Sequence, residues 1–188
     1  MMDDRTLVKN VLAGDMQAFR LLIHQHERLV VHMVGRIVKK QEEVEELCQD
    51  VFMRVHNKLG EFNFQSKLST WIATIAYRQA LNHIRKEKIA YSEIPDEEAF
   101  TQRFVEVANP ESLAEEKDQD AFVLRLIEEL PVQYKTILTL YHVQEMSYPE
   151  ICEITGMPEG TVKNYLFRAR NLLKEKVKKY ISKDDLYE

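Results

Sequence analysis

One stretch near the C-terminus constrains the fold more than any other, residues 147–170, which read SYPEICEITGMPEGTVKNYLFRAR. Ser147 followed by Glu150 three residues later is a capping-box pattern, which predicts that a helix begins there. Gly156 can supply the positive φ of a tight helix end, and Pro158 suits the first turn of a following helix. The stretch therefore predicts two helices joined by a sharp turn, a helix-turn-helix.

The second of these helices is expected to have two different sides. Apolar residues at helical spacing predict the side that faces a core, and they are Val162, Leu166, Ala169 and Leu173. Another side is charged, polar and aromatic, and it carries Lys163, Asn164, Phe167 and Arg168. Such a side suits the major groove of DNA, where Asn pairs with adenine and Arg or Lys pairs with guanine. Thr161 and Arg170 are expected to contact phosphates, and a basic strip is expected to continue along the helix at Lys174, Lys176, Lys178 and Lys179. The chain is therefore predicted to read DNA.

Composition indicates an all-α protein. The 188 residues include only five Gly and five Pro, and a hydrophobic content of 45% is enough for real cores. No apolar run approaches a membrane span, and the N-terminus lacks the pattern of a signal peptide. We therefore expect a cytoplasmic protein that is not membrane-inserted. Cys48 and Cys152 lie far apart in the sequence and are expected to stay reduced.

Charge is unevenly distributed along the chain. The net charge of −5 argues against a simple DNA-binding protein. Residues 91–117, however, carry eight acidic and two basic side chains, whereas residues 161–183 carry eight basic and one acidic side chain. The first of these segments also contains Pro95 and Asn109-Pro110 and lacks sustained periodicity. We predict two small helical domains, residues 1–90 and 118–188, joined by a flexible acidic linker, residues 91–117.

The N-terminal domain is expected to consist of helices. A short helix over residues 5–12 is followed by a helix capped by Asp15, and a third helix spans about residues 42–59. The residues expected to face the core are Phe19, Leu22, Leu29, Met33 and Ile37 in the second helix, and Val44, Leu47, Cys48, Val51 and Val55 in the third. A long helix is predicted from Thr70 to about Lys88 after an intervening loop. Its apolar side is expected to comprise Trp71, Ile72, Ile75, Leu81 and Ile84.

The long helix and the loop before it combine cations with aromatic rings. Arg78, Asn82 and Arg85 lie on the helix, and Phe62 and Phe64 lie in the loop. Cationic and aromatic groups together can hold single-stranded DNA, with bases stacking on rings or flipping out of the duplex. This region is therefore a second candidate nucleic-acid surface, whereas Trp71 is expected to be a core residue.

Four segments in a fixed order resemble one known family. They are residues 14–19 (GDMQAF), 45–52 (EELCQDVF), 62–72 (FNFQSKLSTWI) continued by 75–85 (IAYRQALNHIR), and 130–134 (LPVQY) with 160–170 (GTVKNYLFRAR). In this order they resemble the bacterial RNA polymerase sigma factors of the extracytoplasmic-function (ECF) group of the sigma-70 family. The resemblance covers about residues 5–90 and 118–180. Phe64 departs from the family pattern, which often has Gly in this loop.

The resemblance implies a non-enzymatic promoter-specificity subunit built from a sigma2-like and a sigma4-like domain. Residues implied to read the −35 element as duplex are Thr161, Lys163, Asn164, Phe167, Arg168 and Arg170. Residues implied to open the −10 element and hold a single strand are Phe64, Gln65, Ser66, Lys67, Arg78, Asn82 and Arg85. Residues implied to bind the polymerase clamp are Glu46, Gln49, Asp50 and Met53.

Partners follow from the same resemblance. They are core RNA polymerase, promoter DNA and an anti-sigma factor, with no small-molecule substrate. No cofactor or metal site is expected, because the six histidines are scattered and the chain has no Gly-rich phosphate loop and no Cys-x-x-Cys.

Two other functions remain open from the residues alone. A stand-alone helix-turn-helix regulator would bind operators as a dimer, and it would need a dimerisation surface and a sensing module. A helical interaction scaffold without DNA contact would leave Phe167 and Arg168 unexplained. A basic amphipathic helix could also lie on a membrane surface, although the preceding turn and helix argue against that interpretation.

Overall fold

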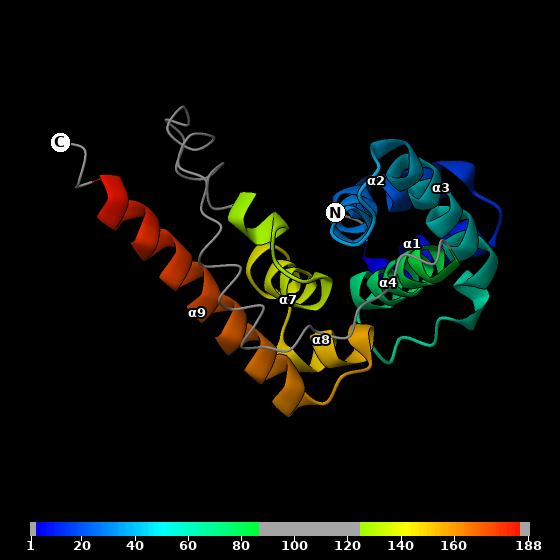
Figure 1. The fold of residues 1–188 in the computed structure, drawn as a ribbon. Coiled ribbons are helices and arrows are strands. Elements are labelled where there is room, and N and C mark those ends of the chain that lie inside the picture. The colour runs from blue at the N-terminus through cyan, green and yellow to red at the C-terminus, as the bar shows by residue number, and fades with distance from the viewer. Residues whose placement is uncertain (1–2, 87–124, 185–188) are drawn as a thin grey trace. The chain divides into compact units, whose positions relative to one another are not determined.

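The structure, a computed structural model, describes residues 3–86 and 125–184. These residues are helical and contain no β-strand, as the all-α prediction requires. Contacts divide the chain into two compact units (Figure 1). The first unit comprises Met1–Tyr91 and Thr139–Glu159, and the second comprises Ser92–Leu138 and Gly160–Glu188. The predicted linker, residues 91–117, lies outside the described residues.

Four helices form the main part of the first unit. They are α1 (Asp4–Leu12), α2 (Met16–Gly35), α3 (Gln41–Lys58) and α4 (Leu68–Lys86), with a 3₁₀ turn at Leu59–Glu61 after α3. Asp3 and Asp15 begin α1 and α2, because their carboxylates accept backbone N–H bonds from the first turn. Helices α2, α3 and α4 pack against one another, and α1 packs on α2.

The core of this unit follows the predicted pattern closely in two helices. In α2 the buried residues include Phe19, Leu22, Leu29 and Met33, and in α3 every predicted inward residue is buried. Helix α4 differs, because Trp71, Ile75 and Leu81 are only half-buried. Small residues and one tyrosine form its inner side instead, namely Ala73, Ala76, Tyr77 and Ala80, together with Ile72 and Ile84. Small side chains let neighbouring helices approach closely, which moves the contact face of α4 away from its largest residues.

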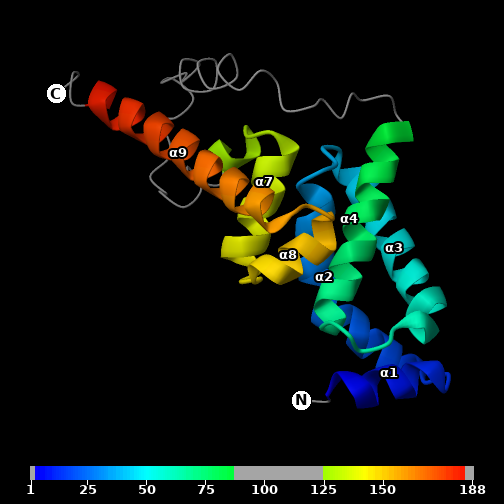
Figure 2. The ribbon, with the colours of Figure 1, turned by 90° about the horizontal axis from the view of Figure 1, so that it is seen from below.

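Residues 139–159 complete the first unit. A π-helical turn over Thr139–Val143 leads to α8 (Tyr148–Thr155), which packs against α4 (Figure 2). The predicted capping box is present, since the Ser147 N–H and Oγ–H both donate to Glu150 Oε2, at 2.8 and 2.6 Å. Gly156 ends α8 with φ of 73°, the left-handed conformation that glycine adopts without steric cost.

The second unit is built from α7 (Val132–Leu138), α9 (Glu159–Asp184) from Gly160 onwards, and a helical segment at residues 125–128. Tyr134 of α7 is 1% exposed, and its ring meets that of Tyr165 of α9 edge-on, with centroids 5.2 Å apart. Two details differ from expectation. Pro158 immediately precedes α9 rather than occupying its first turn, and Leu172 is buried in place of Leu173.

Candidate nucleic-acid interfaces

Helix α9 presents a polar and aromatic side opposite a buried apolar side. Val162, Leu166 and Ala169 are at most 2% exposed, whereas the Phe167 side chain is 64% exposed. An exposed phenyl ring beside polar and charged residues fits the predicted DNA-contacting side, because such a ring can meet a thymine methyl group. Of the other predicted DNA-contacting residues, Lys163, Asn164 and Arg170 are exposed, and Thr161 and Arg168 are half-buried.

The basic residues beyond this side of α9 do not all continue it. Lys176 is 2% exposed and forms an ion pair with Glu129, so it is part of the second unit's interior. The expectation that Lys176 extends the basic strip is therefore wrong. Lys174 is exposed, and Lys178 is exposed and paired with Glu175 at 3.1 Å. Burial of a lysine ammonium is costly unless a carboxylate pairs with it, and Glu129 provides that partner for Lys176.

The loop between α3 and α4 is organised by aromatic rings. Phe62 is 7% exposed, and its centroid lies 4.6 Å from that of Phe64 and 5.3 Å from that of Trp71. The Arg5 guanidinium lies 4.8 Å from the Phe64 ring centroid. Trp71 is thus half-buried against the loop rather than in the core, so the sequence-based prediction of a core residue holds only in part.

Phe64, where the family often has glycine, has φ of 60°. This left-handed conformation is costly for a residue with a side chain. We expect Phe64→Gly to unfold with a free energy about 1 kcal/mol higher than Phe64→Ala, because both lose the ring but only glycine relieves the backbone. Chemical denaturation measures the difference. Asn63, whose φ is not positive, is the control. There, Asn63→Gly should be less stable than Asn63→Ala. Equal stability of the two Phe64 variants would contradict the assignment.

A groove of about 390 Å³ runs between α3 and α4. Two predicted DNA-contacting residues, Arg78 and Asn82, line it from α4. Residues that sequence reasoning missed also line it: Arg54 and Lys58 from α3, and Trp71, Thr74, Ile75 and Gln79 from α4. The spacing of Arg54 and Lys58, four apart on one helical side, was a possible signal. Arg85 is exposed on α4 but does not line the groove.

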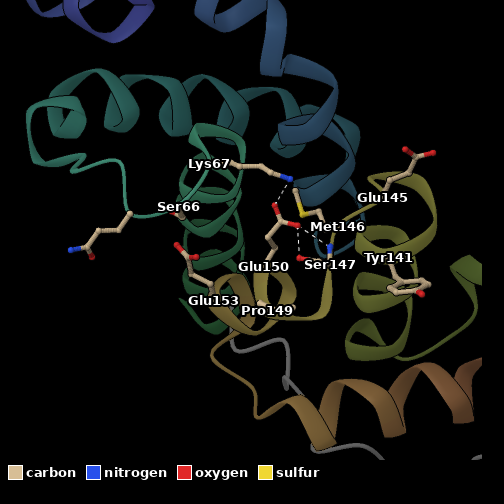
Figure 3. A pocket seen from close by; sticks show the side chains of 10 residues that line it. Ser66, Lys67, Tyr141, Glu145, Met146, Ser147, Pro149, Glu150 and Glu153 are labelled. Carbon is tan, nitrogen blue, oxygen red and sulfur yellow. Dashed lines mark hydrogen bonds and ion pairs between the residues drawn. The ribbon is translucent and has the colours of Figure 1, made fainter. Parts of the chain in front are cut away.

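Three of the other predicted single-strand residues line a separate hollow of about 900 Å³ (Figure 3). Gln65, Ser66 and Lys67 contribute to it, together with residues 141–153. The Lys67 ammonium lies 2.9 Å from Glu150 Oε1. The expected pocket of Phe64–Lys67 with Arg78 and Asn82 is therefore divided between two depressions, and Phe64 lines neither.

Glu150 provides a pH-dependent contribution to stability. Burial alone would raise its pKa, but the hydrogen bonds from Ser147 and from Lys67 outweigh burial and lower the pKa from 4.5 to about 2. A carboxyl whose pKa is lower in the folded state stabilises the fold above its unfolded pKa. We therefore expect this contribution to be intact above pH 4.5 and to disappear as the pH falls towards about 2. Denaturation of wild type and Glu150→Gln across this range measures it. The difference in free energy of unfolding between wild type and Glu150→Gln should become smaller as the pH falls. A difference that does not depend on pH would contradict the lowered pKa of Glu150.

The outer side of α3 carries the residues predicted to bind polymerase. Glu46, Gln49, Asp50 and Met53 are all exposed, with Met53 at 58%. Their spacing places them on one helical side, opposite the buried Val44, Leu47, Val51 and Val55. Exposed methionine beside carboxylates suits an interface with a basic partner.

Two of the histidines make contacts between helices. His83 Nε2 lies 3.1 Å from Glu43 Oε2, joining α4 to α3, and the His56 ring packs edge-on against Phe19. Within residues 3–86 and 125–184, no three metal-binding side chains gather. Cys48 is a buried free thiol whose pKa is raised to about 11 by burial and by nearby Glu45, and Cys152 is also unbridged. In the same described ranges, no helix has the length and apolarity that crossing a membrane requires.

Two family models match the chain. Residues 22–89 match sigma-70 region 2, and residues 122–173 match sigma-70 region 4. The RNA polymerase sigma-H factor of Pseudomonas aeruginosa is 30% identical over 176 residues, covering 90% of this chain and 91% of that protein. The ECF RNA polymerase sigma-E factor of Escherichia coli K12 is 32% identical over 184 residues, covering 95% and 96%.

Solved structures agree in fold. CnrH, solved with the cytosolic domain of CnrY, has a TM-score of 0.65 at 18% identity, covering 93% of this chain and 97% of that one. The sigma factor RpoE of Bartonella quintana, solved with the anti-sigma factor NepR, has a TM-score of 0.63 at 21% identity, covering 87% and 98%. Family models and relatives together decide between the functions left open by the residues. The chain belongs to the ECF group of the sigma-70 family, the non-enzymatic promoter-recognition subunits of RNA polymerase.

Proposed function

We propose that α9 reads the −35 promoter element through Lys163, Asn164, Phe167 and Arg168. The exposed Phe167 ring beside polar residues, on a helix whose opposite side is buried, is the observation that carries this proposal. An amide and a guanidinium can each form paired hydrogen bonds to one base, and an apolar ring can meet a thymine methyl group. Thr161 and Arg170 would bind the flanking phosphates and fix the register of the helix.

The second proposed surface opens and holds the −10 element. Phe64, Gln65, Ser66 and Lys67 form its loop part, and Arg78, Asn82 and Arg85 form its part on α4. The groove supports this role, because Arg54, Lys58 and Arg78 line it together with the aromatic ring of Trp71. Glu61 and Glu153 also line it, and Glu61 pairs with Lys58 at 3.0 Å. Phosphates would be held by the cations and bases by the rings, which is how single strands are bound in general.

The outer side of α3 is proposed to bind core polymerase through Glu46, Gln49, Asp50 and Met53. Residues 1–90 would then act as the polymerase-binding and −10 domain, residues 118–188 as the −35 domain, and residues 91–117 as the acidic linker. Each family match lies within one of the two proposed domains, and neither includes the linker. Because polymerase and chromosome are cytoplasmic, the protein is expected to act in the cytoplasm.

An anti-sigma factor is the proposed regulator. The Bartonella protein was solved with the anti-sigma factor NepR. A partner of that kind is proposed for this chain as well, and co-purification from native lysate tests it. Recovery of the chain only alone or with polymerase would count against it.

Footprinting on a cognate promoter tests the proposed division of labour. The net charge of −5 opposes unaided DNA binding, so we expect the free chain to bind weakly and the chain with core polymerase to protect both elements. Asp50→Lys, which reverses a charge on the proposed polymerase surface, should abolish both protections by preventing assembly. Tight, sequence-specific binding by the free chain would contradict the proposal.

A further inference from the structure

Two carboxylates of α8 point at the proposed −10 surface. Glu150 and Glu153 are three residues apart, so they share a helical side. Glu150 Oε1 lies 2.9 Å from Lys67 Nζ and accepts a hydrogen bond of 3.3 Å from Thr70 Oγ1, as Figure 3 shows for the lysine. The Glu150 side chain is only 16% exposed in this position. The negative charge of α8 thus contacts a cation expected to bind single-stranded DNA.

Glu153 reaches both depressions of this surface. It lines the hollow that contains Gln65, Ser66 and Lys67, and it also lines the groove that contains Arg54, Lys58 and Arg78. A strand bound along the proposed surface would bring phosphates to these same cations. The two carboxylates of α8 therefore lie beside the cations that a bound strand would contact.

Further contacts hold residues 139–159 against the rest of the first unit. The Arg36 Nε–H donates to Thr139 Oγ1 at 3.1 Å, and the Gln144 amide nitrogen lies 2.9 Å from His32 Nδ1. Ile151 and Ile154, on the inner side of α8, are at most 1% exposed. By contrast, the Lys67 side chain is 72% exposed, so the ion pair itself is accessible to water and salt. The contact between α8 and the rest of the unit therefore has two parts. Its apolar part is buried at Ile151 and Ile154, and its Lys67–Glu150 ion pair is open to competition from other ions.

We propose that α8 masks the −10 surface of the free chain, with Glu150 and Glu153 competing against the phosphates of single-stranded DNA. This inference rests on the proposed function of Lys67 and its neighbours. Binding of a strand requires that Glu150 give up its ion pair with Lys67 and that Glu153 move away from the groove that contains Arg54, Lys58 and Arg78. The free chain is therefore held in a form with weak affinity for single strands.

Zero-length crosslinking with a carbodiimide tests the contact in the free, full-length chain. Lys67 and Glu150 should be joined by an amide bond that peptide mass spectrometry identifies, and a mixed-sequence single-stranded oligonucleotide should reduce its yield. The Lys40–Glu43 pair on α3, at 2.5 Å, is the control whose yield should not change. If the control crosslink forms and the Lys67–Glu150 crosslink does not, masking is overturned while the −10 proposal stands.

Charge neutralisation tests the competition. Glu150→Gln/Glu153→Gln keeps side-chain size and the capping of Ser147, since glutamine also serves in a capping box. We expect this variant to bind the labelled oligonucleotide about three- to tenfold more tightly at low salt, because it loses one ion pair with Lys67 and one further negative charge beside the groove. Glu27→Gln/Glu42→Gln removes the same charge from exposed positions on α2 and α3, and should bind as wild type does. Equal affinity of both double variants would overturn masking.

A third variant separates this inference from the function on which it rests. Adding Lys67→Ala to Glu150→Gln/Glu153→Gln removes a proposed DNA contact from a chain already unmasked. Affinity should fall relative to the double variant. If it does not fall, Lys67 is not a single-strand contact, and the proposed function of that residue fails together with the masking built on it.

Discussion

Phe167→Ala is expected to weaken −35 element binding by the polymerase complex by about 1–3 kcal/mol while changing the free energy of unfolding by no more than about 0.5 kcal/mol. The reason is its exposure of 64%, which leaves little packing to lose and an apolar ring free to meet a base. DNase footprinting with the assembled polymerase measures the first quantity, and chemical denaturation of the free chain measures the second.

The neighbouring residue is the matched control. Leu166 is 2% exposed on the opposite side of α9, so Leu166→Ala should lower the free energy of unfolding by about 2–5 kcal/mol. Any loss of binding in that variant would follow from unfolding and should disappear under stabilising conditions. If Phe167→Ala proves as destabilising as Leu166→Ala, the ring is a packing residue and the proposed −35 surface is misplaced.

Asn82→Ala is expected to impair strand opening without preventing the initial complex. Asn82 is exposed and lines the groove between α3 and α4, where its amide can pair with an unstacked base. Loss of one such paired contact should cost about 1–3 kcal/mol of open-complex stability. Permanganate reactivity of −10 thymines reports opening, whereas a gel shift with polymerase reports the initial complex.

Gln25→Ala provides the comparison for this variant. Gln25 is an exposed amide on α2 and lines neither depression, so its removal should leave both readouts at wild-type values. Wild-type thymine reactivity in Asn82→Ala would remove that residue from the −10 surface and would shift attention to Arg54, Lys58 and Arg78, which line the same groove.

Local signals in the sequence predicted local structure well. Asp15, Ser147 and Gly156 each mark a helix end, because capping depends on residues within a few positions of one another. The buried sides of α2 and α3 were also predicted, since both helices carry large apolar residues at regular spacing. The buried side of α4 was not predicted correctly, because it consists largely of alanines. Whether an alanine is buried depends on how closely a neighbouring helix approaches, which the spacing of large apolar residues does not reveal.

In the candidate sites, too, features within one helix could be predicted, whereas features formed by packing between helices could not. The side of α9 that bears Phe167 lies on one helix, so its periodicity alone was enough to predict it. The groove at Arg54 and Arg78 forms only where α3 and α4 pack together, and the contact of Lys67 with Glu150 joins residues more than eighty positions apart. The inward turn of Lys176 towards Glu129 likewise depends on tertiary packing. Such pairings are fixed by the fold and have no signal in the spacing of a single segment.

Run-off transcription with purified core polymerase on a randomised promoter library tests the central claim most directly. We predict that the chain directs initiation from templates that share two separated sequence elements. We also predict that Phe167→Ala relaxes selection at the upstream element and that Asn82→Ala lowers initiation from double-stranded templates more than from templates already opened at the downstream element. If core polymerase with this chain initiates no better than core polymerase alone, on any template, the account is contradicted.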